Sequence, residues 1–252
     1  MPALQYFDCH ARIGRWTAPR PEHILTAEGL VAEMDRYDIA EALVHHASAW
    51  EWAPAPGNET LLREIASYPR LHPCFVALPP ATREMPSPRE MVAQLREAGG
   101  GAVRLFPQFH QYRLADWCCR ELLEVLEAER VPVLLDVTQA DWGVLPEVLT
   151  AHPALPVVLL DVGYRSDRYL YPLWERHQNL HVEIGSYVMH GGVEAVCARF
   201  GPERLLFGTG LPLMDPAGPT ALLAYADAPV AATQLIAGAN LRRLLAGEAQ
   251  DG

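Results

Sequence analysis

The feature that most constrains the fold is an alternation of short apolar runs with longer helical patterns, repeated from one end of the chain to the other. The apolar runs are rich in β-branched residues, and we expect strands at 4–10, 41–47, 72–78, 101–107, 131–137, 155–162, 180–186 and 204–210. Such strands are too apolar to leave one face in water, which favours an α/β fold with a closed parallel sheet, the (β/α)8 or TIM barrel. An open doubly wound sheet is the alternative. It usually has a glycine-rich turn after its first strand, and HARIGRW at 10–16 lacks the GxGxxG spacing.

Length and charge limit the domain organisation and the partners. A single barrel commonly has about 250 residues, so we expect one domain over residues 1–252. Acidic residues outnumber basic ones by 31 to 20, and the formal net charge of −11 argues against nucleic acid or an anionic membrane as a partner. A local group of arginines can still bind a small anion. Self-association into a homo-oligomer stays open.

Cysteine usage and the first residues indicate a compartment. The five cysteines form no CxxC motif, which favours reduced thiols over a disulfide framework. MPALQYFDCH has neither the basic nor the apolar region of a signal peptide, and no apolar run approaches the ~20 residues of a membrane span. We therefore expect a cytoplasmic protein.

Ionisable side chains gather at or near the carboxyl ends of the predicted strands, where barrel enzymes build their active sites. They are Asp8, His10, Arg12, Arg104, Asp136, Asp161 and Glu183. By alternation along the first strand, Asp8, His10 and Arg12 share one side. A carboxylate that ends an apolar run needs a partner, because burying it alone costs several kcal/mol. These groups either pair with one another as structure or form a site.

Short motifs in this order resemble the amidohydrolase superfamily, and within it the amidohydrolase-related branch of decarboxylases, hydratases and lactonases. The motifs include FDCHARIG, GAVRLFPQF, VPVLLDV, LPVVLLDVG and FGTGLP, and together they extend over nearly the whole chain. The resemblance implies a distorted (β/α)8 barrel with its site at the carboxyl ends of the strands.

The metal ligands that the resemblance implies are mostly replaced. The His-x-His pair of the first strand falls on His10 and Arg12, and the histidines that end strands five and six fall on Asp136 and Asp161. The aspartate of strand eight falls on Gly210, so only His10 keeps a ligand residue. A divalent metal at His10, Asp136 and Asp161 is the less favoured alternative, because Arg12 is a fixed cation. We expect no tightly bound cofactor.

We therefore predict a hydrolase for a small carboxylated substrate of lactone or amide type. His10, Asp136 and Asp161 are the predicted catalytic groups, and Arg12 and Arg104 are the predicted clamp for an organic acid. A decarboxylase or hydratase acting on a similar acid, or a catalytically silent barrel that binds a metabolite, stays open.

Further side chains are predicted to contact the substrate. Glu183 lies within the seventh predicted strand, His110 follows the fourth, and Tyr164 follows the sixth. Loops at these positions line the active-site face of a barrel.

Overall fold

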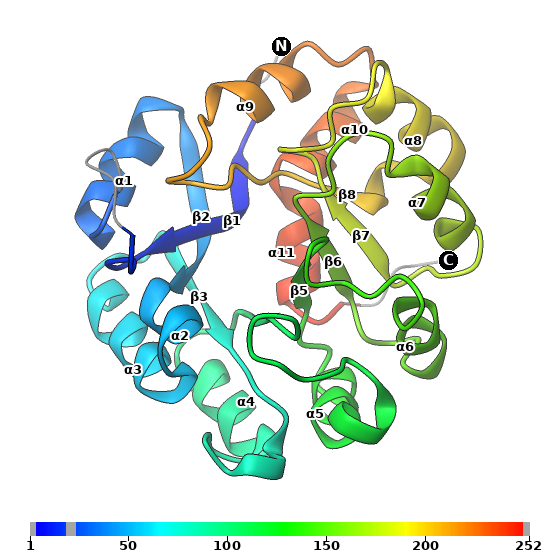
Figure 1. Ribbon diagram of the computed structural model, residues 1–252. Coiled ribbons are helices and arrows are strands. Elements are labelled where there is room, and N and C mark those ends of the chain that lie inside the picture. Colours follow the sequence, from blue (N-terminus) through cyan, green and yellow to red (C-terminus); the bar gives the residue numbers. More distant parts are fainter. Residues whose placement is uncertain (1–3, 19–23, 249–252) are drawn as a thin grey trace.

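The computed structural model describes residues 4–18 and 24–248, and it shows a ring of parallel strands surrounded by helices (Figure 1). The 8-stranded sheet follows the chain order, β1 to β8, with every neighbouring pair parallel. The strands are β1 (Tyr6–Ile13), β2 (Ile39–His46), β3 (Leu71–Val76), β4 (Ala102–Leu105), β5 (Val133–Asp136), β6 (Val157–Leu160), β7 (Leu180–Glu183) and β8 (Leu205–Leu206). The predicted (β/α)8 barrel is confirmed, and each strand overlaps its predicted range.

Helices lie between successive strands, and others follow the last strand. They are α1 (Ala27–Arg36), α2 (Ala47–Glu51), α3 (Pro54–Ile65), α4 (Pro88–Glu97), α5 (Asp116–Ala128), α6 (Leu145–Ala151), α7 (Asp167–Trp174), α8 (Gly192–Phe200), α9 (Ala217–Ala224), α10 (Val230–Gln234) and α11 (Asn240–Leu245), with a π-helical turn η3 (Leu235–Ala239) before the last. Ser87 begins α4 with a capping box, since its side chain and that of Glu90 each bond the other's backbone N–H. None of the helices in the described ranges has the length and apolarity that a bilayer crossing requires.

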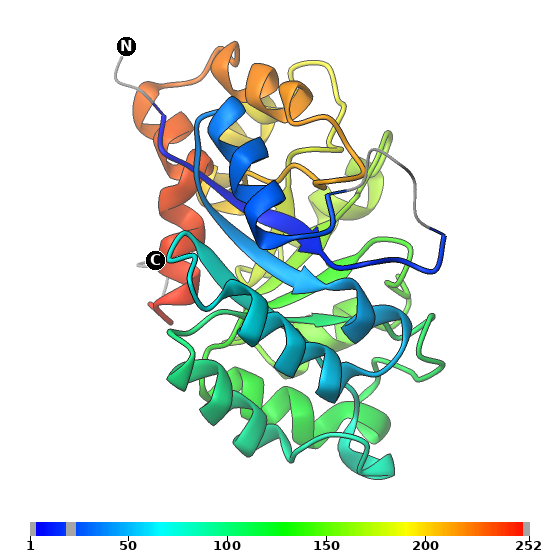
Figure 2. The same cartoon turned by 90° about the vertical axis from the view of Figure 1, so that its left-hand side faces the viewer.

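Two apolar clusters hold the barrel together. The larger one joins the outward faces of the strands to the helices. The smaller one fills the interior of the barrel, and it includes Phe7, Leu43, Leu134 and Leu206 from the strands and Leu241 from α11. In Figure 2, α11 (red) lies at the end of the barrel away from the arrowheads of the strands, which leaves the carboxyl ends uncovered by this helix.

The interior changes from apolar to charged toward the carboxyl ends of the strands. Ala102 and Leu134 belong to the interior apolar cluster, and two residues further along the same strands are Arg104 and Asp136. Side chains two residues apart in a strand point to the same face, so both charges face the barrel interior. The layer above the apolar interior is therefore polar.

The barrel closes between β1 and the segment after the short β8. Cys9 N donates to the carbonyl oxygen of Phe207 at 3.0 Å, and Arg12 N donates to that of Leu211 at 3.1 Å. Side chains support these backbone bonds. The buried carboxylate of Asp8 accepts from Thr209 N at 2.9 Å and from Thr209 Oγ1 at 2.5 Å. Asp8 thus joins the first strand to the last, whereas His10 faces the charged layer.

The substitution Thr209→Val should lower the free energy of unfolding by about 1.5–3 kcal/mol at pH 8, because it removes a buried hydrogen bond to a charged carboxylate. Burial raises the pKa of Asp8 to about 6 against the three donors that lower it, so Asp8 is neutral in the folded protein at pH 4.5. The cost should be smaller at that pH. Urea denaturation at both pH values measures it, with the exposed Thr82→Val as the control. Equal effects of the two substitutions would contradict this account of barrel closure.

Candidate active site at the carboxyl ends of the strands

Arg104, in β4, contacts the side chains of His10, His45 and Asp136 in the charged layer. Its Nη2 donates to Asp136 Oδ1 at 2.5 Å and lies 3.1 Å from His10 Nε2, and its Nη1 lies 3.2 Å from His45 Nδ1. Arg104 is 3% exposed, and the side chain of Asp136 is 15% exposed. The structure thus brings together three predicted site residues from β1, β4 and β5 around a desolvated ion pair.

The contact with Arg104 decides which nitrogen of His10 carries its proton. A guanidinium can only donate, so Nε2 of His10 must accept and Nδ1 must carry the hydrogen of the neutral ring. The pKa of His10 lies well below 6.5, because the ring is buried and because Arg104 and Arg12 are close, so the neutral form is the stable one. Its Nδ1 has no hydrogen-bond partner within the described ranges.

Two carboxyl groups face that Nδ1. Asp161 Oδ1 lies 4.0 Å from it and Glu183 Oε2 lies 3.9 Å from it. Both distances are too long for direct hydrogen bonds, and they leave room for an oxygen atom that could bond both sides.

The two carboxyl groups differ in their surroundings. Burial, and then the charge of Asp161, raises the pKa of Glu183 well above its ordinary value. Burial and the charge of Asp136 also raise the pKa of Asp161, but its side chain is 45% exposed. Asp161 follows β6 with φ +53°, a left-handed conformation that Asp adopts more readily than most residues. Asp161 is therefore the carboxylate that a ligand can reach.

Glycines make room for Glu183. A Cβ at position 185 would lie 2.2 Å from Glu183 Oε1, and a Cβ at position 208 would lie 2.4 Å from its Cγ. Gly185 N also donates to Oε1. The glycines of the EIGSY and FGTG segments thus allow a buried carboxyl group between β7 and β8.

Arg12 is a buried cation that lacks a direct counter-ion. It is 6% exposed, its guanidinium carbon lies 3.6 Å from the ring centroid of Trp16 and 5.2 Å from that of Trp50, and no carboxylate of the described ranges forms an ion pair with it. Burial and the nearby Arg104 lower its pKa to about 9, while Asp136 and Asp161 oppose the shift. Stacking on Trp16 holds the guanidinium in place without neutralising it.

His10, Asp136 and Asp161 form a group that could hold a metal ion, since their donor atoms lie within 4.8 Å of one another. The residue types alone therefore do not support the prediction that no metal is bound. The hydrogen bonds give a different indication. Arg104 already uses Nε2 of His10 and Oδ1 of Asp136, and Nδ1 of His10 carries a proton. As placed, these residues do not fit a divalent ion.

Two predicted substrate contacts lie apart from these bonds. His110 Nε2 is 2.7 Å from the carbonyl oxygen of Trp50, and the ring packs against Phe106 and Phe109. Tyr164 is exposed beside Arg165. Their roles stay predictions.

His45, Trp16 and Trp50 are not among the site residues predicted from the sequence. His45 is buried against Arg104, and Trp16 and Trp50 flank Arg12. The His-His pair that ends β2 was the available signal for His45. For Trp16 the available signal was its distance of four residues from Arg12.

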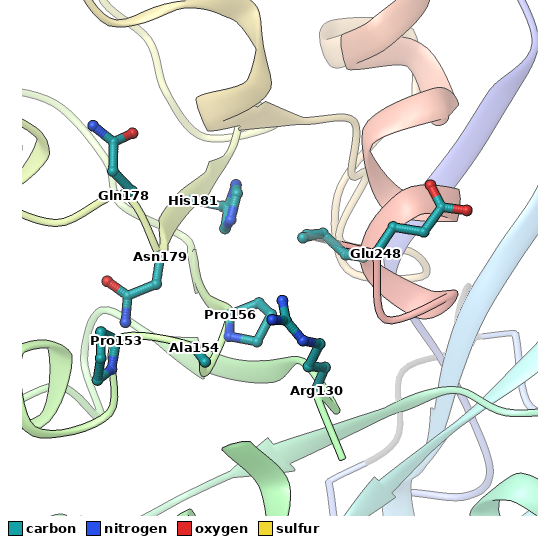
Figure 3. A pocket seen from close by; sticks show the side chains of 9 residues that line it. Arg130, Pro153, Ala154, Pro156, Gln178, Asn179, His181 and Glu248 are labelled. Atoms are coloured by element: carbon teal, nitrogen blue, oxygen red, sulfur yellow. The ribbon is translucent and has the colours of Figure 1, made fainter. Parts of the chain in front are cut away.

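A cavity of about 320 Å³ lies at the opposite end of the barrel (Figure 3). It is lined by Arg130, Pro153, Ala154, Pro156, Gln178, Asn179, His181, Leu244 and Glu248, which precede or begin the strands β5, β6 and β7 or belong to α11 and the segment after it. Its lining includes none of the charged residues described above. The charged layer is therefore the better candidate for chemistry.

Comparison with known proteins supplies a family and a fold. The family model described as Amidohydrolase matches residues 7–247. An uncharacterized TIM-barrel protein of Bordetella bronchiseptica is 19% identical, with a TM-score of 0.74 and 97% of this chain and 99% of that chain covered. A 5-carboxyvanillate decarboxylase of Sphingomonas paucimobilis is 13% identical, with a TM-score of 0.76 and the same coverage. The corresponding Novosphingobium aromaticivorans enzyme, solved with manganese, is 12% identical, with a TM-score of 0.78 and 96% and 97% covered.

At identities of 12% to 19%, these solved structures show only that the chain shares their fold. No curated protein matches the sequence.

The substitution Asp136→Asn should lower the free energy of unfolding by about 3 kcal/mol, because it leaves the buried guanidinium of Arg104 without its counter-charge. Asp141→Asn is the matched control, since Asp141 pairs with Arg113 on the surface and such a pair contributes about 0–1 kcal/mol. Urea denaturation measures both. A stable Asp136→Asn variant would show that the buried pair does not hold the site together.

Proposed function

The chain belongs to the amidohydrolase family, and from this membership we propose that it is an enzyme that hydrolyses a small carboxylated substrate of lactone or amide type without a tightly bound metal. The observation that carries the proposal is a base and a donor that face each other beside a cation without a counter-ion. Asp161 Oδ1 lies 4.0 Å from the Nδ1–H of His10, and Arg12 lies nearby without an ion-pair partner within the described ranges.

Arg12 is the proposed clamp for the substrate carboxylate. A guanidinium binds a carboxylate through two parallel N–H bonds, which fixes the orientation of the ligand as well as its charge. Because Arg12 is buried and stacked on Trp16, the ligand meets a cation that is already desolvated and held. The ion pair of Arg104 with Asp136 leaves Arg12 as the available anion site.

In the proposed reaction, Asp161 takes a proton from a water molecule as the water oxygen attacks the carbonyl carbon. His10 donates from Nδ1 to that water and orients it, and Arg104 keeps this tautomer in place. When the tetrahedral intermediate collapses, the carbon–oxygen or carbon–nitrogen bond breaks. The leaving atom takes the proton back from Asp161.

Decarboxylation is the second candidate, and a specific observation favours it. The solved neighbours include decarboxylases, and the raised pKa of Asp161 also suits a proton donor. In that reaction Asp161 protonates the carbon that bears the carboxylate, the carbon–carbon bond breaks, and carbon dioxide leaves.

A substrate panel with one variant tests the proposal. We expect hydrolysis of lactones and amides that carry a free carboxylate and none of their methyl esters, with product analysis by chromatography and mass spectrometry. Arg12→Met should reduce kcat/KM by about 100-fold, since hydrogen bonds to a charged group contribute about 1.5–3 kcal/mol. Arg113→Met is the control on the surface. Release of carbon dioxide as the sole reaction would favour the second candidate, and ligand binding without turnover would indicate a silent barrel.

The pH profile separates the two reactions. As a base, Asp161 must be ionised, so kcat/KM for hydrolysis should fall as the pH drops through its pKa, which lies above 3.8. As the acid of a decarboxylation, Asp161 must be protonated, so the rate should instead fall as the pH rises. Asp161→Asn should cost about 100-fold or more in either case, while Asp141→Asn should not. A profile that Asp161→Asn leaves unchanged would remove Asp161 from the mechanism.

A further inference from the structure

We infer that the guanidinium of Arg104 occupies a latent divalent-metal site formed by His10, Asp136 and Asp161, and that removing it opens this site. The chain would then differ from a metal-binding barrel in two ways. Some ligand residues are replaced, and the side chain of Arg104 fills the site. This inference concerns metal binding and is independent of the reaction proposed above.

The first support is the position of one nitrogen atom. The three donor residues have ligand atoms within 4.8 Å of one another, a spacing suited to one ion. Divalent ions lie about 2.0–2.3 Å from nitrogen and oxygen donors. Arg104 Nη2 lies 2.5 Å from Asp136 Oδ1 and 3.1 Å from His10 Nε2, so an ion bound to the same two atoms would compete with it for space.

The second support is the lone pair of His10. A neutral imidazole has one nitrogen with an available lone pair, and a metal ion binds through that pair. In this structure the pair on Nε2 accepts a hydrogen bond from Arg104, and Nδ1 carries the proton. Neither nitrogen of His10 can therefore bind an ion while Arg104 stays in place.

The third support is the local charge. Arg104 and Arg12 place two cations in the same layer as Asp136 and Asp161, so these four groups sum to zero. A divalent ion added to them would be repelled by both arginines. Without Arg104 the same layer has an excess of negative charge, and three donor residues are free to converge on an ion.

The same group of donors is oxygen-rich, which favours a hard divalent ion over Zn²⁺. Manganese is the probe of choice, because it accepts mixed carboxylate and imidazole ligands and is detected directly by electron paramagnetic resonance.

The test is a titration of metal-free protein with MnCl2, followed by calorimetry and electron paramagnetic resonance. We expect one Mn²⁺ per chain in Arg104→Ala, bound at least about 100-fold more tightly than by the unsubstituted protein, given the repulsion between charges a few ångströms apart. Asp136→Asn in the Arg104→Ala background should abolish the gain. Arg12→Met is the matched control, because it also removes one positive charge but leaves the donors of His10 and Asp136 engaged.

Three results would overturn the inference. They are stoichiometric Mn²⁺ binding by the unsubstituted protein, no gain in Arg104→Ala, and an equal gain in Arg12→Met, which would make charge rather than occupancy the cause. If Arg104→Ala folds poorly, the titration is repeated with Arg104→Gln, and a rise in Tm with Mn²⁺ in either variant, absent from the unsubstituted protein, supports the site. The Mn²⁺ titration of the unsubstituted protein tests the inference even if neither variant folds.

Discussion

The buried ion pair between Arg104 and Asp136 is the interaction on which the rest of the candidate site depends. It places a fixed cation inside the barrel, where a charge without a partner would cost several kcal/mol. Through the same guanidinium, His10 is held in one tautomer and its Nδ1–H faces Asp161 and Glu183. Each of these consequences follows from one planar group with several fixed donors, a geometry that lysine would not supply.

The fold makes this pair possible by separating two layers inside the barrel. Apolar side chains and α11 fill the end from which the strands begin, so the interior there needs no polar partners. The charged layer lies where the strands end, and the bonds from Asp8 to Thr209 keep the first and last strands together beside it. The apolar interior and the charged layer thus occupy different levels of the same barrel.

Much of this arrangement follows from patterns that local sequence carries. The apolar runs predicted all the strands, because a strand buried on both faces leaves a signal in its own residues. Arg104, Asp136 and Asp161 were found because a charge at the end of an apolar run is unusual. His45 and Trp16 were not predicted as site residues, since neither residue type is unusual at a strand end or in a loop.

The sequence by itself therefore determined the barrel and the level at which the charges lie. Only the tertiary structure decided which arginine is paired and which is not. That choice depends on distances between β1, β4 and β5, which lie far apart in the chain and leave no trace in local pattern. Arg104 reaches Asp136, whereas Arg12 stacks on Trp16 instead. From this one difference follows the tautomer of His10, and it leaves Arg12 as the proposed site for an anion.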